Sequence, residues 1–511
     1  MIWKIAKREF LLNLMTFKFA VGTIVCVVLT IVFVPLLVSD YQQRLKDYDE
    51  HVAANEAELR KVKVYKNITP TVYRRPSPLS VFREGLEKRL GSSMPIQPES
   101  VPEMTIALAE DNPFLSIFPA MDVSLLCEIV VSVLALLLAY DAISGERERG
   151  TLKLMVASTV ARHTILWGKL VAGLISLTLP VTMAFLIAIL ILEFAPLVEL
   201  TGPDWAKIGL IYLGTLVFTS VMYTVGLFFS CLARKSAVSL MLALLFWVLS
   251  IIVIPGANAP LAARIQPLEL REEVESRIRS VRDDMRKREG PGMSEQLAQF
   301  TRGVVSGRED AFQRRYICLI AKSEVEYRRK QQVLQDSFNL RCAEKTWEIE
   351  HRYFASLVRQ KSLADGLSAI SPISLYARVM SSLSDSDLGS FQYFTNMARA
   401  YRMQVLDYMR DQTNNFSSLS YFTPCSEEDT VETERRYENK EYRAAWGEWV
   451  DAKEAAQPAL DLQDLPRFRY EPPVWSSLQR AIPDLGLLTF FGILFLALSL
   501  VAFMKYDVRS D

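Results

Sequence analysis

Six long apolar runs determine most of what this chain of 511 residues can fold into. Each is close to the roughly 20 residues that a helix needs to cross the hydrocarbon core of a bilayer. The runs cover residues 19–38, 121–140, 170–192, 207–232, 238–255 and 485–504. Core helices of soluble proteins rarely extend so far without a polar face. We therefore predict an all-α membrane protein with six transmembrane helices.

The segment before the first run is predicted to be a helix that lies at the membrane surface. Residues 1–18 have an amphipathic pattern, with Trp3, Phe10 and Leu14 on one helical face and basic residues elsewhere. The first run then ends in VPLLVSDY, without the small residues of a signal-peptide cleavage site. We expect this run to be retained as a membrane helix.

Basic residues near the ends of the runs predict which side faces the cytoplasm. Lys and Arg are concentrated on one side of the predicted spans. The connecting segments on that side hold 13 of them in 59 residues, whereas the residues beside the span ends on the other side hold four in 70. The basic set consists of 1–18, 141–169, 233–237 and the tail 505–511. We predict that this set, and with it both termini, is cytoplasmic.

The same assignment places two long segments, 41–118 and 256–484, outside the cytoplasm. The pattern predicts that 256–484 is a large, mainly helical domain, and that 41–66 is a charged helical stretch followed by proline-broken loop. Helices are expected over 264–289, up to a Gly-Pro-Gly break at 290–292, then over 309–366 and 388–412, with loop over 413–484. Their apolar stripes favour packing against one another, with a binding surface as the alternative.

Several classes of function are disfavoured by composition. Lys plus Arg and Asp plus Glu are both 58, so a basic nucleic-acid binder is not expected. The histidines form no HExxH pair, the cysteine spacings fit no metal site, and no Ser-His, Asp-Asp or His-Glu set lies inside the runs. We expect no catalytic residues, no metal and no cofactor. Cys318, Cys342 and Cys425 lie in the outer segments and allow at most one internal disulfide.

The segment 141–169 between the second and third runs is the most informative part of the chain. It begins Asp141-Ala-Ile-Ser-Gly-Glu-Arg-Glu-Arg-Gly150-Thr-Leu-Lys, a short charged helical elbow at the membrane face that suits docking to a cytoplasmic partner. Gly145-x4-Gly150-Thr151 resembles the start of a phosphate-binding loop. However, the lysine before Thr151 is missing and no strand precedes the motif, so we exclude nucleotide binding here.

This segment, DAISGERERGTLKLMVASTVARHTILWGK, resembles the loop after the second span in ABC-2-type transporter permeases, which have the type V exporter fold. Residues 226–255, GLFFSCLARKSAVSLMLALLFWVLSIIVIP, are similar to the tight inside turn between the fourth and fifth spans of that family, and residues 1–18 to its elbow helix. The large segment 256–484 departs from the minimal family and resembles a subgroup with an extracytoplasmic domain before the last span.

The resemblance implies a permease subunit without enzyme activity of its own, in a bacterial inner (plasma) membrane. It implies an ABC ATPase as a separate subunit, a second identical or similar permease chain, and export of an unidentified substrate. The residues that match the coupling element are Glu146, Arg147, Glu148, Arg149, Gly150 and Thr151. The alternative for these charges is a solvated run that only flanks a membrane helix. The alternative function is a mechanotransmitter or scaffold that acts on an extracytoplasmic partner without moving cargo.

Glu128 is an acidic residue inside the second run, roughly 10 Å from its start at 1.5 Å per residue. Because no Lys or Arg lies in the interior of a run, we expect Glu128 to be protonated or to contact hydroxyl groups. Two roles are open for Glu128: it lines the substrate pathway, or it forms a hydrogen bond between two helices. Asp122, near the outer end of this run, is expected to be solvated. Pro35 and Pro180 are expected to kink their helices.

Overall fold

The computed structural model describes residues 2–103, 122–152, 161–301, 322–429 and 455–505, with a few single positions between 430 and 454. Within these ranges nearly all regular structure is helical, and the one sheet pairs β1 (Thr71–Tyr73) with β2 (Ser93–Pro95). Six helices are long and apolar enough to cross a bilayer. The predicted all-α membrane fold with six spans is therefore confirmed.

The helices that account for these spans are continuous with shorter elements at their ends. A first helix, α1 (Ile2–Leu14), precedes them. The spans are formed by α2 (Phe17–Leu59), then α3 (Val123–Leu126) with the π-helical η3 (Cys127–Val131) and α4 (Ser132–Ala139), then α7 (Arg162–Glu193), α8 (Gly202–Leu232), α9 (Ser236–Val248) with the π-helical η4 (Leu249–Val253) and α10 (Ile254–Ile265), and α20 (Val474–Met504). Pro35 and Pro180 lie inside α2 and α7.

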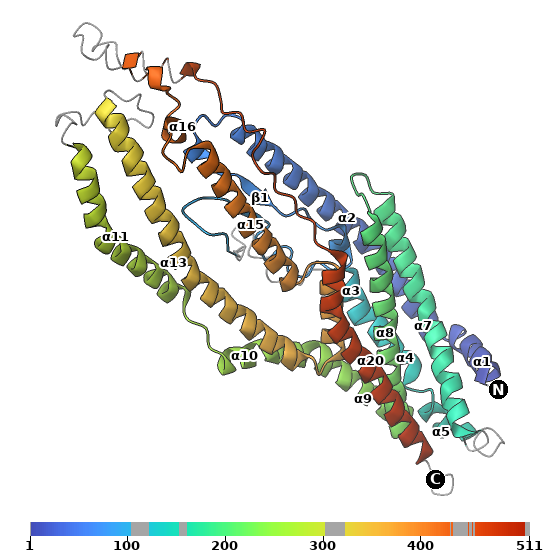
Figure 1. Cartoon of the computed structure of the whole chain (residues 1–511). Coiled ribbons are helices and arrows are strands. Elements are labelled where there is room, and N and C mark those ends of the chain that lie inside the picture. The colour runs from blue at the N-terminus through green and yellow to red at the C-terminus, as the bar shows by residue number, and fades with distance from the viewer. Residues whose placement is uncertain are drawn as a thin grey trace.

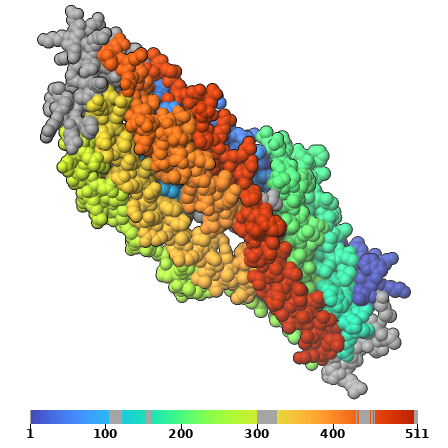
Figure 2. Space-filling model, viewed as in Figure 1, coloured from blue at the N-terminus to red at the C-terminus, as the bar shows by residue number. Residues whose placement is uncertain are grey.

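The molecule is elongated, and the start of α1 and the end of α20 lie toward the same end of it (Figure 1). We call this the terminal end of the helix bundle, and the opposite end, from which the remaining helices extend, the domain end. In Figure 2, α20 is exposed along the side of the bundle. In the most apolar 18-residue stretch of each span, 67% of the residues are buried in the second span and 61% in the fourth. The corresponding share is 17% in the fifth and in the sixth span. The second and fourth spans therefore form the centre of the bundle.

Close approach at the centre of the bundle depends on small residues, as is usual where membrane helices pack. A Cβ on Gly173 of α7 would come within 2.0 Å of the ring of Tyr223 on α8. A Cβ on Gly226 of α8 would come within 2.7 Å of the Ala139 side chain on α4. These two glycines set how closely α8 can approach its neighbours.

The first outer segment begins as a direct extension of the first span. The 43 residues of α2 would reach about 65 Å, twice the thickness of a bilayer core. The charged helical stretch expected from Tyr41 onward is thus the outer half of α2, which ends at Leu59. Two short helices, η1 (Tyr65–Asn67) and η2 (Pro78–Val81), and the strands β1 and β2 follow it.

The second outer segment contains long helices that pack beside one another (Figure 1). They are α11 (Arg271–Thr301), α13 (Lys322–Ser368), α14 (Pro372–Leu383), α15 (Leu388–Gln412) and the short α16 (Leu419–Phe422). The helix predicted over 388–412 has these bounds. Of the outer cysteines, Cys342 is free, Cys425 is disulfide-bonded and Cys318 lies outside the described residues.

The predicted break at 290–292 is wrong, because α11 continues through Pro291. A proline inside a helix costs about 3 kcal/mol through the lost hydrogen bond and a clash with the preceding turn. The helix stays continuous here while it packs along α13, and one of the contacts between the two helices is the ion pair between Glu289 Oε2 and Arg341 Nη2 at 2.5 Å. Local sequence signals do not include such contacts with a second helix.

The outer domain inserts one helix, α14, between the membrane spans. Its buried residues Ile373, Leu375, Tyr376 and Val379 belong to the same hydrophobic core as the spans. The Tyr376 ring stacks on Phe218 of α8, with centroids 4.3 Å apart. The hydroxyl of Tyr376 also lies 3.0 Å from the Thr215 hydroxyl, also on α8. The outer domain therefore shares a core with the fourth span.

Ion pairs at the domain end reinforce this attachment. Asp385, just after α14, contacts Lys207 in the first turns of α8. Arg480 of α20 lies 2.8 Å from an Asp387 carboxylate oxygen. On α14 itself, Arg378 Nη2 lies 2.6 Å from Asp484 Oδ1 of α20. Because these pairs are shielded from solvent, removal of one partner costs more than it does in an exposed pair.

Replacing Tyr376 by Ala tests whether α14 holds the two parts together. Loss of a fully buried aromatic side chain should lower the free energy of unfolding by about 3–5 kcal/mol. Thermal unfolding of the detergent-purified chain measures the effect. The control is Met403→Ala on α15, where the side chain is 47% exposed. Equal melting temperatures for the two variants would contradict the shared core.

Candidate coupling site

The loop that follows the second span folds into a short helix, α5 (Ser144–Glu148), at the terminal end. The hydroxyl oxygen of Ser230, on α8, accepts hydrogen bonds from the backbone N–H groups of Ile143 at 2.9 Å and Ser144 at 3.0 Å. Free N–H groups at a helix N-terminus need such acceptors. The start of α5 is therefore fixed to the end of α8.

Glu146 points from α5 into the protein. Its Oε1 lies 3.0 Å from Nζ of Lys169, which is on α7. The same Nζ lies 2.9 Å from Oε1 of Glu9 on α1, and the Lys169 side chain is only 3% exposed. One buried ammonium therefore joins α5, α7 and α1. We call Glu9, Glu146 and Lys169 the lysine cluster.

Arg147 and Glu148 bind the turn between α8 and α9. Arg147 Nη1 donates to the backbone oxygen of Ala233 at 3.1 Å. An oxygen of Glu148 accepts from the backbone N–H of Ser236 at 3.2 Å and from its hydroxyl at 2.7 Å. Ser236 begins α9, where a carboxylate is favoured by the helix dipole. The loop and this turn therefore form one unit.

Among residues 141–152, the exposed ones form a continuous stretch, Glu148, Arg149, Gly150 and Thr151. Gly150 has φ +73°, a left-handed conformation that favours glycine at the end of a helix, and a Cβ there would meet nothing within 4 Å. The Thr151 hydroxyl donates a hydrogen bond to the backbone oxygen of Glu146 at 3.2 Å. Residues 148–151 thus present a surface, which we call the exposed turn.

The six residues singled out in the sequence are therefore divided by the structure. Glu146 and Arg147 face the protein, whereas Glu148 to Thr151 face solvent, and Glu148 also binds Ser236. Sequence reasoning missed Lys169 and Glu9, which carry the connection inward. Lys169 could have been suspected, since it directly precedes an apolar run. Residues 153–160 of the predicted loop lie outside the described residues.

A further ion pair ties the base of the loop to the first span. Lys18 Nζ, near the start of α2, lies 2.6 Å from Asp141 Oδ2 and donates to the Tyr140 hydroxyl at 2.8 Å. Asp141 is the residue at which the charged loop begins. The loop thus contacts α1, α2, α7, α8 and α9 through specific polar groups.

Comparison with known protein families identifies the family of this chain. The model for the ABC-2 family transporter protein matches residues 3–508. The chain belongs to the ABC-2 transporter family. It is therefore a multi-pass membrane protein and a permease component, as predicted from the loop and the spans. No curated protein matches the chain. The family match assigns no role to individual residues, so the coupling role of residues 146–151 stays a prediction.

At the domain end, Glu128 has a cationic partner, contrary to our expectation from the sequence. Arg83 Nη1 lies 2.8 Å from Glu128 Oε1 and 3.6 Å from Asp122 Oδ1. Arg83 follows η2 in the first outer segment, so it reaches the span from outside, where a search confined to the apolar runs could not find it. Asp122 was expected to be solvated, but it is 6% exposed and caps α3 by accepting from Leu125 N at 2.7 Å.

Replacing Lys169 by Met tests whether the lysine cluster connects the loop to α1. The change leaves Glu9 and Glu146 facing each other without a cation, and losing one partner of a buried pair costs about 3–5 kcal/mol. Hydrogen exchange should therefore become faster in α1 and α5 of the purified chain. Lys4→Met, at an exposed position on α1, is the control. Unchanged exchange in both helices would rule out the connection.

Proposed function

We propose that this ABC-2 protein is the permease subunit of an ABC exporter whose ATPase is a separate chain that docks on the exposed turn. The observation that carries this proposal is the lysine cluster, because it links the loop to α1 and α7 through buried charges. A partner that displaces α5 thereby acts on the bundle and not on an isolated loop. Coupling of this kind requires that the ATP-bound partner binds the two states of the bundle with different affinity.

The fold of the loop supports the proposal of a separate ATPase. The segment from Gly145 to Thr151 folds as a helix and a turn, without the strand and lysine of a phosphate-binding loop. The exposed turn instead offers Glu148, Arg149 and Thr151 to a protein surface. Its charges of both signs suit a groove with complementary charges, which favours specific pairing.

We further propose that two permease chains assemble, with their termini and exposed turns in the cytoplasm of a bacterial cell. The excess of Lys and Arg beside the terminal end supports this orientation. Apolar side chains are exposed on the flanks of α2, α9 and α20, for example Leu36 at 62%, Met241 at 63% and Ile493 at 63%. Lipid and a second chain together would cover these flanks.

A second function, transmission of force to an extracytoplasmic partner without cargo, is favoured by the domain end. The continuous helix α2 leads from the first span far into the outer segment. α14 is packed between spans, and Arg378 and Arg480 join the outer domain to α20. A shift of the spans would therefore be passed to the outer helices.

Arg149→Glu tests docking on the exposed turn. The tagged chain is purified in mild detergent, and mass spectrometry identifies a co-purifying protein with Walker motifs. Reversal of an interfacial charge should reduce recovery of that ATPase by about tenfold or more. Arg8→Glu makes the same charge change at an exposed position of α1 and should have little effect. Equal recovery of the ATPase with both variants would overturn docking at this turn.

Hydrogen exchange of the permease–ATPase complex, with and without trapped ATP, separates the two functions. Force transmission predicts changed protection in α14 and the outer half of α2 in the absence of any cargo. Export with a static outer domain predicts changes confined to the spans and the loop. A complex in which ATP alters neither region would contradict both functions.

A further inference from the structure

The fifth span continues beyond the thickness of a bilayer as a helix with almost no polar side chains. The stretch Ser236–Ile265, which comprises α9, η4 and α10, has 30 residues. It would reach about 45 Å at 1.5 Å per residue, whereas the hydrocarbon core is about 30 Å thick. From Ile252 to Ala263 its only polar side chain is that of Asn258. The last turns of this stretch therefore either leave the path of the span or extend beyond the bilayer.

The helix changes direction where the span ends. The π-helical η4 and two prolines of α10, Pro255 and Pro260, interrupt the regular α-helical hydrogen bonds. Helices bend at such positions. In Figure 1, α10 leads sideways away from α9 and from the bundle, toward the side on which α11 and α13 lie. It is thus a separate arm and not a further length of the span.

Charged groups place the start of this arm at the outer end of the spans. The uncharged run of α20 begins directly after Asp484, which is paired with Arg378 of α14. Arg378 also donates to the backbone oxygen of Asp365, near the end of α13. The hydroxyl of Ser371 in turn donates to the backbone oxygen of Ser250 in η4 at 2.8 Å. α10 therefore leaves the bundle at the level where the apolar run of α20 begins.

α13 covers only one side of α10. Asn258 and Ala262, one turn apart on that side, are buried, and the two helices pack against each other. The side-chain amide nitrogen of Gln360 on α13 donates to the backbone oxygen of Gln266 at 2.8 Å. The remaining surface of α10 is exposed and apolar, and its larger side chains are Val253, Leu261 (46% exposed) and Ile265 (63% exposed).

This exposed side continues the apolar flank of the fifth span. The flank carries exposed apolar side chains along α9 and η4, namely Val238, Met241, Leu245, Val248, Leu249 and Ile252. Ile370, which directly precedes Ser371 beside η4, is exposed as well. One apolar surface thus extends from the flank of the span onto α10.

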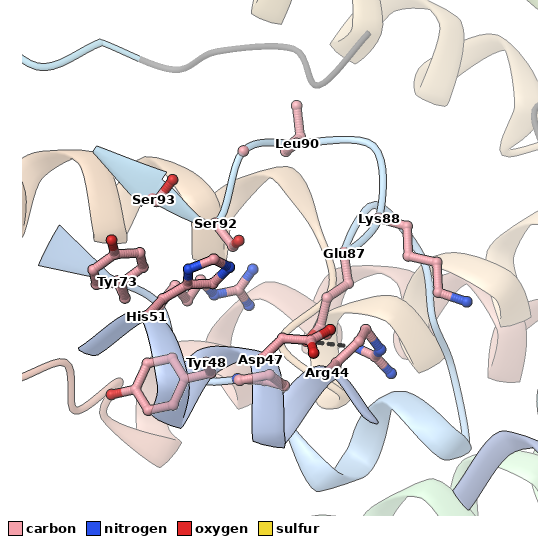
Figure 3. Close-up of a pocket in the computed structure, with 13 residues that line it drawn as sticks. Arg44, Asp47, Tyr48, His51, Tyr73, Glu87, Lys88, Leu90, Ser92 and Ser93 are labelled. Atoms are coloured by element: carbon pink, nitrogen blue, oxygen red, sulfur yellow. Dashed lines mark hydrogen bonds and ion pairs between the residues drawn. The ribbon is translucent and has the colours of Figure 1, made fainter. Parts of the chain in front are cut away.

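The first outer segment has the opposite character. A cavity of about 550 Å³ there is walled by the outer half of α2, the strand β1 and the loop that leads to β2 (Figure 3). In its wall, Arg44 pairs with Glu87 at 3.2 Å, and Arg44 also pairs with Asp40 at 3.0 Å. Asp40 lies two residues beyond the apolar run 19–38. Charges thus begin directly at the outer end of the first span, whereas α10 stays apolar for a further three turns.

We propose that the exposed side of α10 binds the outer surface of the lipid bilayer, with Leu261 and Ile265 among the acyl chains and Arg264 at the phosphate groups. A helix with an apolar side and a cationic end suits this boundary. Arg264 lies in the last turn, and its long side chain can extend the guanidinium to the headgroups. The bound arm attaches the base of α13 to the membrane at a distance from the bundle. This inference goes beyond the proposed function, because it requires neither an ATPase nor a substrate.

A second permease chain is the alternative occupant of this surface. Protein interfaces carry about one hydrogen bond per 100–200 Å². The exposed residues from Ile252 to Ala263 offer no polar side chain for such bonds. Acyl chains need no polar partner, so the composition of the surface favours lipid.

Fluorescence quenching in lipid nanodiscs tests the proposal on the full chain. Leu261→Cys and Ile265→Cys are labelled with the dye NBD, and the discs contain phosphatidylcholine with or without bromine atoms on the upper part of its acyl chains. Leu186→Cys marks contact with lipid, because Leu186 is 62% exposed toward the outer end of the third span. We expect both α10 positions to show roughly half or more of the quenching at Leu186.

Met403→Cys is the matched control, because Met403 is exposed on α15 in the outer domain and should show no quenching. The free cysteines of the described residues are buried, and the unsubstituted chain, labelled in the same way, gives their background. Ile265→Cys keeps the test informative if Leu261→Cys impairs folding. Quenching on α10 no greater than at Met403 would overturn the proposal. Cross-linking of Leu261→Cys to a second copy would then identify that chain as the occupant.

Discussion

The buried ammonium of Lys169 is the interaction on which the terminal end of the bundle depends. It is placed where the ends of three helices meet, and it is the only group that contacts both Glu9 and Glu146 among the ion pairs of the described residues. Two carboxylates so close together would repel each other without it. The cluster explains how a five-residue helix with few apolar contacts keeps a defined position.

The domain end shows the same principle with different residues. There Lys207 and Arg480 lie in the first turns of α8 and α20, and Asp385 and Asp387 lie in the turn after α14, so opposite charges meet where the outer domain joins the bundle. The apolar residues of α14 fill the space between the spans below them. Polar contacts thus fix both ends of the bundle, while small residues such as Gly173 and Gly226 allow close packing between them.

Sequence reasoning was reliable where a signal is local and periodic. Long apolar runs gave the spans, and the amphipathic spacing of residues 388–412 gave α15, because each depends only on neighbours along one helix. It failed where the decisive partner is distant in the chain. Glu128 is paired with Arg83 from another segment, and α11 continues through Pro291 while it packs against α13.

The candidate coupling site was predictable to the same extent and for the same reason. The charge pattern of residues 146–149 predicts a docking role, which stays a prediction, and it could not show which of these charges face inward. That division depends on Lys169 and Ser236, which lie 23 and 88 residues from their partners in the loop. The sequence pattern also could not predict that α14 packs between the spans. An amphipathic helix has an apolar face, but that face does not specify which hydrophobic core it joins.

The energies involved limit how the ABC-2 fold can switch. Converting a population of 1:99 into 99:1 needs about 5.5 kcal/mol of differential binding. Breaking the lysine cluster in each cycle would cost about 3–5 kcal/mol, most of that amount. A mechanism that keeps the cluster intact loses none of it. We therefore infer that α1, α5 and the adjoining part of α7 move together, along with the end of α8 and the start of α9, to which α5 is bonded through Ser230 and Ser236.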